Sequence, residues 1–166
     1  MTDILTTAQT LTTAIAPERP EDEAAVEALV LAAFGPGRFA KTAERLREGS
    51  VPAAGFVAHE AGEVVGSVRL WPIRVGETRA LFLGPIAVDA NRRSAGLGAE
   101  LVAACIDFAR VSDTGGVLLV GDAAYFERFG FVAAPDAVLP GPVDRRRVLW
   151  LANTIVGPEG KVVLDR

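Results

Sequence analysis

A strand pattern, a helical pattern and a second strand pattern follow one another in the middle of the chain. Residues 79–88 are rich in apolar side chains, an amphipathic stretch covers residues 96–110, and residues 117–120 are wholly apolar. A short run that is apolar throughout is typical of a strand covered on both faces. Two strands joined by a helix of this length pair in parallel through a right-handed crossover. The chain therefore predicts a sheet that contains a parallel pair.

The segments before this unit predict antiparallel strands. Residues 55–59, 64–73 and 79–88 have strand character, and the turn pairs Ala61-Gly62 and Gly76-Glu77 separate them. Strands joined by turns this short form an antiparallel meander. The sheet is therefore expected to be mixed, with a first strand at residues 11–16 and a last strand at residues 148–156.

Helical spacing marks further segments on either side of the meander. Apolar residues recur at helical spacing from Val26 to Phe34, and the acidic run at residues 21–23 lies at the N-terminal end, where the helix dipole favours negative charge. A second, short helix is predicted at residues 38–47. Near the C-terminus, residues 122–129 predict a short helix with Asp122 as its N-cap and a left-handed Gly130 at its end.

These elements predict a mixed α/β (α+β) domain with a central sheet of about six or seven strands and about four helices. The chain has 166 residues, a length that suits one compact domain, and no linker divides it. We expect residues 11–166 to form this single domain and residues 1–10 to form a flexible N-terminal tail.

The composition argues against several classes of function. The formal charge is −4, and the basic residues fall mainly in two short clusters, Arg92-Arg93 and residues 145–147, so we expect no nucleic-acid partner. No apolar run approaches the roughly 20 residues of a membrane-spanning helix, and the N-terminus lacks a secretory pattern, so we expect a cytoplasmic protein with no membrane partner. The single cysteine, Cys105, rules out an internal disulfide and a cysteine-cluster zinc site, and we expect no metal.

The loop that precedes the central helix carries the strongest indication of a ligand. Gly96 and Gly98 lack a Cβ atom, so the backbone can turn sharply there and approach a bound molecule closely. The N–H groups of a helix's first turn have no partner inside the helix and can hold a diphosphate. Arg93 can add a bidentate contact, and Ser94 can donate its hydroxyl hydrogen. The pattern predicts a phosphate-bearing cofactor.

Two other phosphate-binding motifs do not fit this loop. The P-loop requires a Gly-Lys-Ser/Thr triplet, which the chain lacks. The dinucleotide fingerprint requires a third glycine after Gly96-Leu97-Gly98, where Glu100 and Leu101 stand instead. Nucleoside triphosphates and NAD are therefore poor candidates for the cofactor.

Two segments resemble the conserved blocks of a known family. Residues 86–98, Ile-Ala-Val-Asp-Ala-Asn-Arg-Arg-Ser-Ala-Gly-Leu-Gly, resemble the acetyl-CoA-binding motif of the GNAT superfamily of N-acetyltransferases, whose core is Arg or Gln-x-x-Gly-x-Gly or Ala. Residues 118–131 resemble the second conserved block of that superfamily. The combination of Leu-Gly-Pro-Ile-Ala-Val, Val-Gly-Asp and Arg-Phe-Gly-Phe is similar to the small bacterial YhbS-like branch of predicted acetyltransferases.

The resemblance implies that acetyl-CoA is the co-substrate and that it lies at the centre of the sheet. The strand that ends at Val88 is then expected to be bulged and to splay from the strand near Val117. Backbone groups at the bulge would pair with the amides of pantetheine as an added strand does. The residues that the resemblance assigns to the cofactor are Ile86, Ala87, Val88, Arg93, Ser94, Ala95, Gly96, Leu97, Gly98 and Ala99.

The residues for proton transfer depart from the family's pattern. Family members usually keep a tyrosine four residues before the glycine of the Gly-Phe pair, and this position is Phe126. Tyr125 precedes it. Neighbouring helical residues point about 100° apart, so Tyr125 can act as the catalytic acid only if its helix is rotated or the first turn of that helix is irregular, and otherwise it is a packed aromatic. The family's frequent glutamate base, early in the central strand, is replaced by Leu-Phe-Leu at residues 81–83.

The preferred function is an N-acetyltransferase that acts by direct attack in a ternary complex. Its acceptor is the primary amine of a small molecule, an amino acid or a protein, and the resemblance implies that a homodimer can form. The alternative is a catalytically weak or inactive acyl-CoA-binding regulatory module on the same fold, and a third option is a scaffold without affinity for CoA. Trp71 and Phe34 can line the amine pocket or pack in the core, and His59 is interpreted as a surface or hairpin residue.

Overall fold

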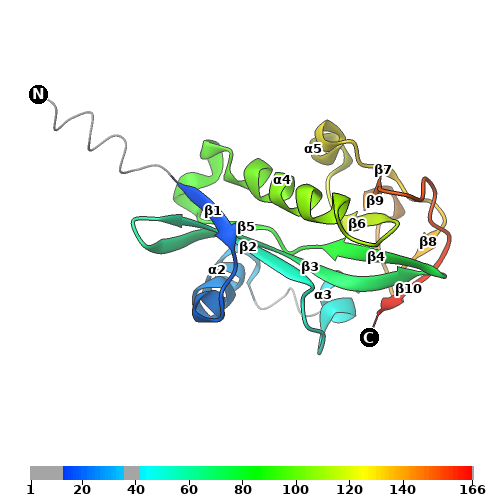
Figure 1. The fold of residues 1–166 in the computed structure, drawn as a ribbon, viewed down its shortest axis with the longest axis horizontal. Helices are drawn as coiled ribbons and strands as arrows, with labels where there is room; N and C mark the ends of the chain where they lie inside the picture. Colours follow the sequence, from blue (N-terminus) through cyan, green and yellow to red (C-terminus); the bar gives the residue numbers. More distant parts are fainter. Residues whose placement is uncertain (1–12, 36–41, 166) are drawn as a thin grey trace, which may run out of the picture.

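The protein forms one curved sheet with helices on both faces (Figure 1). The computed structural model describes residues 13–35 and 42–165, and for residues 93–95 the backbone alone, so the expected tail at residues 1–10 lies outside it. Seven strands pair along the main path of the sheet, in the order β1-β2-β3-β4-β6-β9-β7. Their bounds are β1 Ala14–Pro17, β2 Ala54–Glu60, β3 Glu63–Val75, β4 Thr78–Leu83, β6 Gly116–Val120, β9 Val148–Ala152 and β7 Val132–Ala133. The mixed fold that the sequence predicts is confirmed.

Three short strands lie off this path. They are β5 (Ala87–Val88) and β10 (Gly160–Leu164), which both pair with β3, and β8 (Ala137–Val138), which pairs with β10. The meander is antiparallel, with Phe56 opposite Val68 and Leu70 opposite Leu83. β4 and β6 are parallel. The predicted mixture of antiparallel and parallel pairs is therefore present.

Four α-helices occur among the described residues: α2 Glu23–Phe34, α3 Thr42–Arg47, α4 Leu97–Arg110 and α5 Ala123–Phe126. The first and third match the predicted helices, whereas residues 38–41 of the predicted second helix lie outside the description. The predicted 122–129 helix is irregular, because α5 passes into the 3-10 turn η4 (Glu127–Phe129). As predicted, the Asp122 side chain accepts a hydrogen bond from the Ala124 amide, and Gly130 has a φ of 96°.

The two faces of the sheet bury different helices because side chains alternate along a strand. Val68 and Leu70 of β3 pack against Leu101 and Val102 of α4. On the other face, Val57 of β2 packs against α2. The apolar stripe predicted for α4 is buried at all six positions: Leu97, Leu101, Val102, Cys105, Ile106 and Ala109.

The strand predicted at residues 79–88 is interrupted, which corrects the sequence interpretation. β4 pairs with β3 up to Leu83, and β5 resumes the pairing at Ala87, opposite Ser67. Two residues of β3 thus face the three residues 84–86, which is the signature of a bulge. β4 pairs with β6 only at Leu81 and Phe82, so the two parallel strands separate where the bulge begins. The expected splay is present, with the bulge at residues 84–86.

The C-terminal region contains structure that the sequence pattern does not predict. The strand expected at residues 148–156 ends at Ala152, because the amides of Asn153, Thr154 and Ile155 all turn to the carbonyl of Gly115. β10 then returns to pair with β3, with Val162 opposite Val75.

Within residues 13–35 and 42–165, no helix is long and apolar enough to cross a membrane.

Candidate active site

Two cavities lie on either side of the bulge at residues 84–86. The first, cavity A, has a volume of about 570 Å³, and the second, cavity B, about 790 Å³. Cavity A is lined by Ala33, Phe34, Ile86, Ala87, Val88, Gly96, Gly98, Ala99, Tyr125 and Arg128. Cavity B is bounded by residues of the 18–30 and 44–55 segments together with Arg69, Trp71 and Pro85. Adjacent residues of one short segment, Pro85 and Ile86, therefore face different cavities.

The loop between β5 and α4 is held by local polar contacts. Asp89 accepts a hydrogen bond from the Asn91 amide at 2.9 Å and begins the 3-10 helix η3 (Ala90–Ala95). The Arg92 side chain donates to Glu60 on the neighbouring hairpin at 2.5 Å, and this hydrogen bond raises the pKa of Arg92. The loop is thereby tied to the sheet, and the start of α4 is held beside cavity A.

The two glycines of the loop act in different ways. Gly96 has a φ of 77°, a left-handed conformation that L side chains rarely adopt, and a Cβ atom there would meet nothing within 4 Å. Gly98 has an ordinary backbone, and a Cβ atom there would lie 3.4 Å from the Tyr125 hydroxyl oxygen. Gly96 is thus needed for the turn, while Gly98 keeps the space between α4 and Tyr125 open.

The first turn of α4 presents its amides at cavity A. The Glu100 amide is hydrogen bonded to the Gly96 carbonyl at 3.2 Å, whereas the amides of residues 97–99 precede the first intrahelical partner. Gly98 and Ala99 line the cavity. The Leu97 side chain packs in the core beside Ala58 and Val65, so only its backbone can serve a ligand. These amides and the helix dipole favour an anion at this end of the cavity.

The predicted cofactor residues that line cavity A are Ile86, Ala87, Val88, Gly96, Gly98 and Ala99. The structure thus brings together two segments that the resemblance assigns to one ligand. The side chains of Arg93, Ser94 and Ala95 lie outside the described part of the chain. Their expected contacts with the cofactor stay predictions.

Tyr125, rather than Phe126, faces cavity A. Phe126 is only 8% exposed and belongs to the apolar core, where its ring meets that of Phe131 at 5.7 Å between centroids. Tyr125 lines the cavity with its hydroxyl near Gly98. Both residues lie in α5, and the 3-10 turn η4 begins only at Glu127, so it is the rotation of the helix about its axis that turns Tyr125 to the cavity and Phe126 to the core. Whether Tyr125 acts as an acid stays a prediction.

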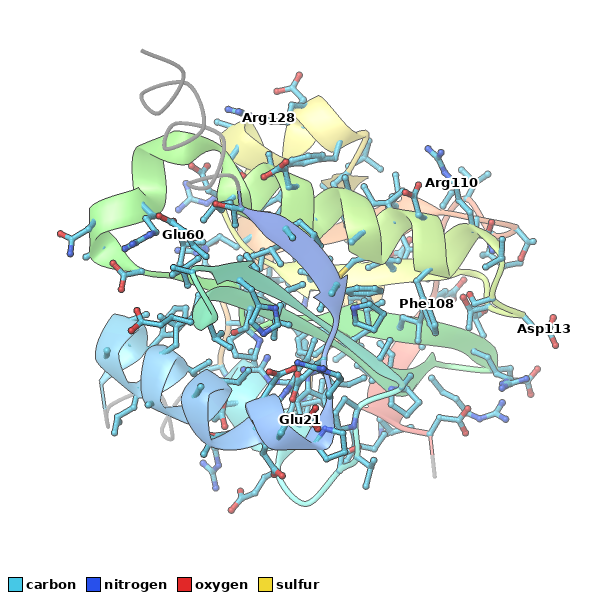
Figure 2. All side chains as sticks on the ribbon, turned by 60° about the vertical axis from the view of Figure 1, so that its left-hand side comes forward. Glu21, Glu60, Phe108, Arg110, Asp113 and Arg128 are labelled. Carbon is cyan, nitrogen blue, oxygen red and sulfur yellow. The ribbon has the colours of Figure 1, made fainter. Side chains whose placement is uncertain are left out.

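Arg128 lines cavity A and was not predicted as a site residue. It lies near the N-terminal end of α4, whereas Arg110 lies at the opposite end (Figure 2). The signal available in the sequence was spacing, since residues three apart on a helix share a face and Tyr125 already marked that face. Within residues 118–131, the family pattern points to the tyrosine position and not to Arg128.

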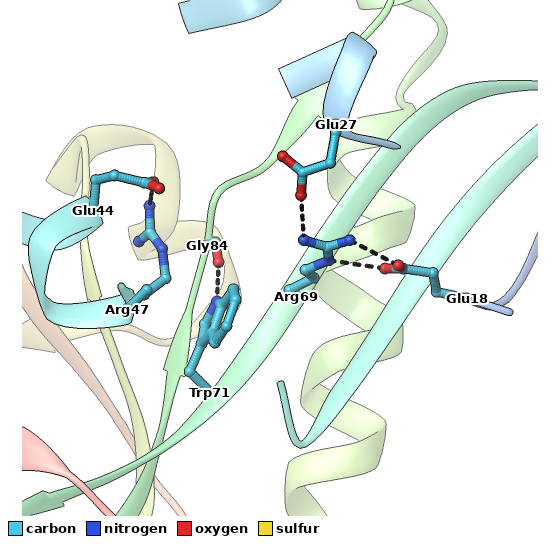
Figure 3. A network of polar contacts seen from close by, with 7 residues as sticks. All are labelled: Glu18, Glu27, Glu44, Arg47, Arg69, Trp71 and Gly84. Carbon is cyan, nitrogen blue, oxygen red and sulfur yellow. Dashed lines mark hydrogen bonds and ion pairs between the residues drawn. The ribbon is translucent and has the colours of Figure 1, made fainter. Parts of the chain in front are cut away.

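Cavity B contains a network of ion pairs (Figure 3). Arg69 donates to both carboxylate oxygens of Glu18, at 3.0 and 2.8 Å, and to Glu27 at 2.9 Å. The hydrogen bonds to Glu18 raise the pKa of Arg69 further above its ordinary value. Arg47, which is 8% exposed, donates to Glu44 at 2.8 Å. The cavity therefore offers fixed charges of both signs to a ligand.

Trp71 forms the wall between this network and the bulge. Its side chain is 7% exposed, it lines cavity B, and its indole Nε1 donates a hydrogen bond to the carbonyl oxygen of Gly84 at 2.6 Å. Of the two aromatic residues proposed for the amine pocket, Trp71 lines cavity B, whereas Phe34 lines cavity A. The sequence left open for both residues whether they line the amine pocket or pack in the core or at its rim, and the structure places them in different cavities.

Other candidates from the sequence lie away from the cavities. His59 is 23% exposed and its Nε2 lies 3.1 Å from Asp22 Oδ1, so it ties β2 to the start of α2. Cys105 is fully buried, and burial raises the pKa of its thiol to about 12. Residues 145–147 are exposed. Within the described ranges, no three His, Cys, Asp or Glu side chains converge on a metal site.

Known proteins are similar to this chain in both sequence and architecture. The model of the acetyltransferase (GNAT) family matches residues 21–131. An uncharacterized N-acetyltransferase of Escherichia coli K12, YhbS, is 33% identical over 120 residues, which cover 70% of this chain and 72% of YhbS. The crystal structure of E. coli YhbS in complex with CoA has a TM-score of 0.80 at 28% identity and covers 93% of this chain and 91% of the other.

A second solved structure, a GNAT family acetyltransferase from Brucella melitensis in complex with acetyl-CoA, has a TM-score of 0.74. It is 26% identical and covers 93% of this chain and 97% of its own. The glycine loop before α4, the splayed parallel strands β4 and β6 and the family match over residues 21–131 all indicate the same family. The chain is a member of the GNAT family of N-acetyltransferases.

Proposed function

We propose that the protein transfers the acetyl group of acetyl-CoA to a primary amine, with the coenzyme in cavity A and the amine in cavity B. The observation that carries this proposal is the bulge, because residues 84–86 separate the two cavities by the width of one chain segment. A donor and an acceptor bound on either side meet there, and holding both converts a bimolecular transfer into an effectively unimolecular one.

The described residues of cavity A suit the coenzyme. The open space over Gly96 and the amides at the start of α4 fit a diphosphate. β5 ends the interrupted strand, and backbone groups beside it can pair with the amides of pantetheine. The complexes of E. coli YhbS with CoA and of the Brucella protein with acetyl-CoA support this assignment.

The chain must supply two proton transfers. The bound thioester provides the acetyl group and a thiolate as leaving group. An amine with a pKa of about 10.4 must first lose a proton, and we assign this proton to a carboxylate that lines cavity B. Of the described residues that line cavity A, Tyr125 alone carries a hydroxyl, so we assign to it the proton that the thiolate receives. Backbone amides near Val88 are assigned to the developing oxyanion.

The acceptor class is the finer part of the proposal. A cavity of about 790 Å³ lies in the range of small-molecule sites, and its paired glutamates and arginines suit a polar amine such as a small metabolite or an amino acid.

We also assign the reaction to the cytoplasm, since acetyl-CoA is made and used inside the cell, and treat residues 11–166 as a single domain. The homodimer stays a prediction from the family resemblance.

A second function is favoured by one observation. Phe126 occupies the usual tyrosine position and is buried in the core, which suits a catalytically weak acyl-CoA-binding regulatory module. Release of free thiol from acetyl-CoA with a panel of small amines, amino acids and peptides separates the two functions. Turnover on any amine supports transfer. CoA binding measured by calorimetry, with no turnover on the whole panel, supports the regulatory module, and the absence of binding rejects both.

A further inference from the structure

Among the residues that the structure describes, Tyr125 and not an acidic side chain positions Arg128. Its Nε donates a hydrogen bond of 2.9 Å to the carbonyl oxygen of Tyr125, and its guanidinium carbon lies 4.5 Å from the centroid of the Tyr125 ring. A guanidinium over an aromatic face is a favourable arrangement that also limits the side chain's freedom. The side chain is therefore held over the ring although it is exposed.

The remaining donors of this guanidinium are available to a ligand. Across residues 13–35 and 42–165, no hydrogen bond or ion pair engages the two terminal nitrogens of Arg128. Arg92, by contrast, is paired with Glu60 at 2.5 Å, and Arg69 with Glu18 and Glu27. A positioned guanidinium without a carboxylate partner presents the fork geometry that suits a phosphate.

The opposite wall of cavity A favours the same kind of ligand. Arg128, Gly96 and Gly98 line this one cavity, and the Tyr125 hydroxyl would be 3.4 Å from a Cβ atom at Gly98. The segment that carries Arg128 therefore lies across the cavity from the first turn of α4, where backbone amides and the helix dipole favour an anion. An anion between the two walls would contact amides on one side and a guanidinium on the other.

We propose that Arg128 binds a phosphate group of acyl-CoA, together with the first turn of α4. The inference rests on the assignment of the coenzyme to cavity A. It adds a binding residue from outside the glycine loop and gives Tyr125 a second role, as the aromatic support that orients the guanidinium. The ligand chemistry is a phosphate, which in CoA is either the diphosphate or the 3′-phosphate.

The test compares Arg128→Gln with Arg110→Gln, a change of the exposed arginine that ends α4 on the side away from cavity A. Calorimetry measures binding of CoA, dephospho-CoA and pantetheine, which has no phosphate. The expected result is CoA binding at least tenfold weaker in Arg128→Gln, with no difference between variant and wild type for pantetheine. Arg128→Lys should recover part of the loss, and the CoA affinity of Arg128→Gln should depend less steeply on salt than that of wild type.

The three ligands also distinguish the two phosphate sources. A loss that persists with dephospho-CoA assigns Arg128 to the diphosphate, and a loss that disappears assigns it to the 3′-phosphate. Equal CoA affinity in Arg128→Gln and wild type overturns the proposal, as does an equal loss for pantetheine, which would indicate a structural effect. A wild-type protein that binds no CoA refutes the proposed function itself, whereas normal wild-type binding with an unaffected Arg128→Gln refutes only this inference.

Discussion

The indole nitrogen of Trp71 and the carbonyl oxygen of Gly84 form a buried hydrogen bond of 2.6 Å. Gly84 is the first residue of the bulge, and Trp71 belongs to β3 and lines cavity B. The Gly84 amide in turn donates to the carbonyl of Arg69 at 2.9 Å. Both the amide and the carbonyl of Gly84 are therefore hydrogen bonded to β3, which holds the bulge in place. This bulge separates the two cavities.

Replacing Trp71 with Phe should affect both stability and catalysis. The variant leaves a buried carbonyl without its donor, which costs about 1–3 kcal/mol. Because the freed segment separates the two cavities, we expect kcat/KM for acetyl-CoA to fall as well. Urea unfolding and steady-state kinetics measure the two effects.

Trp150→Phe is a matched control for this change. Trp150 is 1% exposed and its Nε1 donates to the carbonyl of Ile155 at 2.8 Å, but it lines neither cavity. It should lose a comparable amount of stability and keep its kcat/KM. Equal kinetic losses in both variants would show that Trp71 acts only through stability.

Replacing Tyr125 with Phe tests the assigned acid. The change removes the hydroxyl and keeps the ring that supports Arg128. If the hydroxyl protonates the departing thiolate, turnover at saturating acetyl-CoA should fall at least tenfold, in the range of about 10²–10⁴ typical of general acids. CoA affinity should change little. An unchanged turnover number would eliminate Tyr125 as the acid.

Replacing Gly96 with Ala should weaken coenzyme binding. Gly96 has a φ of 77° beside the helix amides that are assigned to the diphosphate, so an alanine there strains the turn. Gly62→Ala is the control, because Gly62 lies in the turn between β2 and β3 with a φ of 80° and equally open space around its Cβ position. Both variants should lose about 1 kcal/mol of stability. Calorimetry should show weaker CoA binding in Gly96→Ala alone, and equal affinity in the two variants would contradict the assignment.

Asp22 should make stability depend on pH in the acid range. The hydrogen bond from the Arg19 amide, at 2.9 Å, is the main cause that lowers the pKa of this carboxyl below its ordinary 3.8, and His59 adds to it. A lowered folded-state pKa stabilises the protein above the ordinary value, and this contribution is lost as pH falls through the folded-state pKa. The melting temperature of wild type should exceed that of Asp22→Asn at pH 7, and the difference should shrink below pH 3.8. A constant difference from pH 7 to pH 2 would assign the effect to geometry alone.

Local pattern was sufficient for much of the fold. The six buried positions of α4, the cap at Asp122 and the left-handed Gly130 follow from spacing and residue type within a few neighbours. The same holds for the glycine loop, because the first turn of a helix has free amides wherever it occurs. The family resemblance added the expectation of a splayed parallel pair, which a linear pattern does not contain.

Long-range pairing decided the remaining features. Residues 79–88 are rich in apolar side chains, so their pattern predicts one strand, and only the register against β3 reveals the bulge after Leu83. Tyr125 faces the cavity while Phe126 packs in the core against Phe131, and this orientation of α5 depends on tertiary packing rather than on spacing along the helix.

The residues that line the two cavities also come together through contacts between segments that are distant in sequence. Glu18 and Glu27 lie 51 and 42 positions away from Arg69, and Arg128 reaches the start of α4 from a different conserved block. By itself the sequence determined which segments become helices and strands and where a phosphate can be held, because those properties depend on neighbours along the chain. Only the tertiary structure decided which side chains meet across the bulge, since that depends on strand register and on packing between segments distant in sequence.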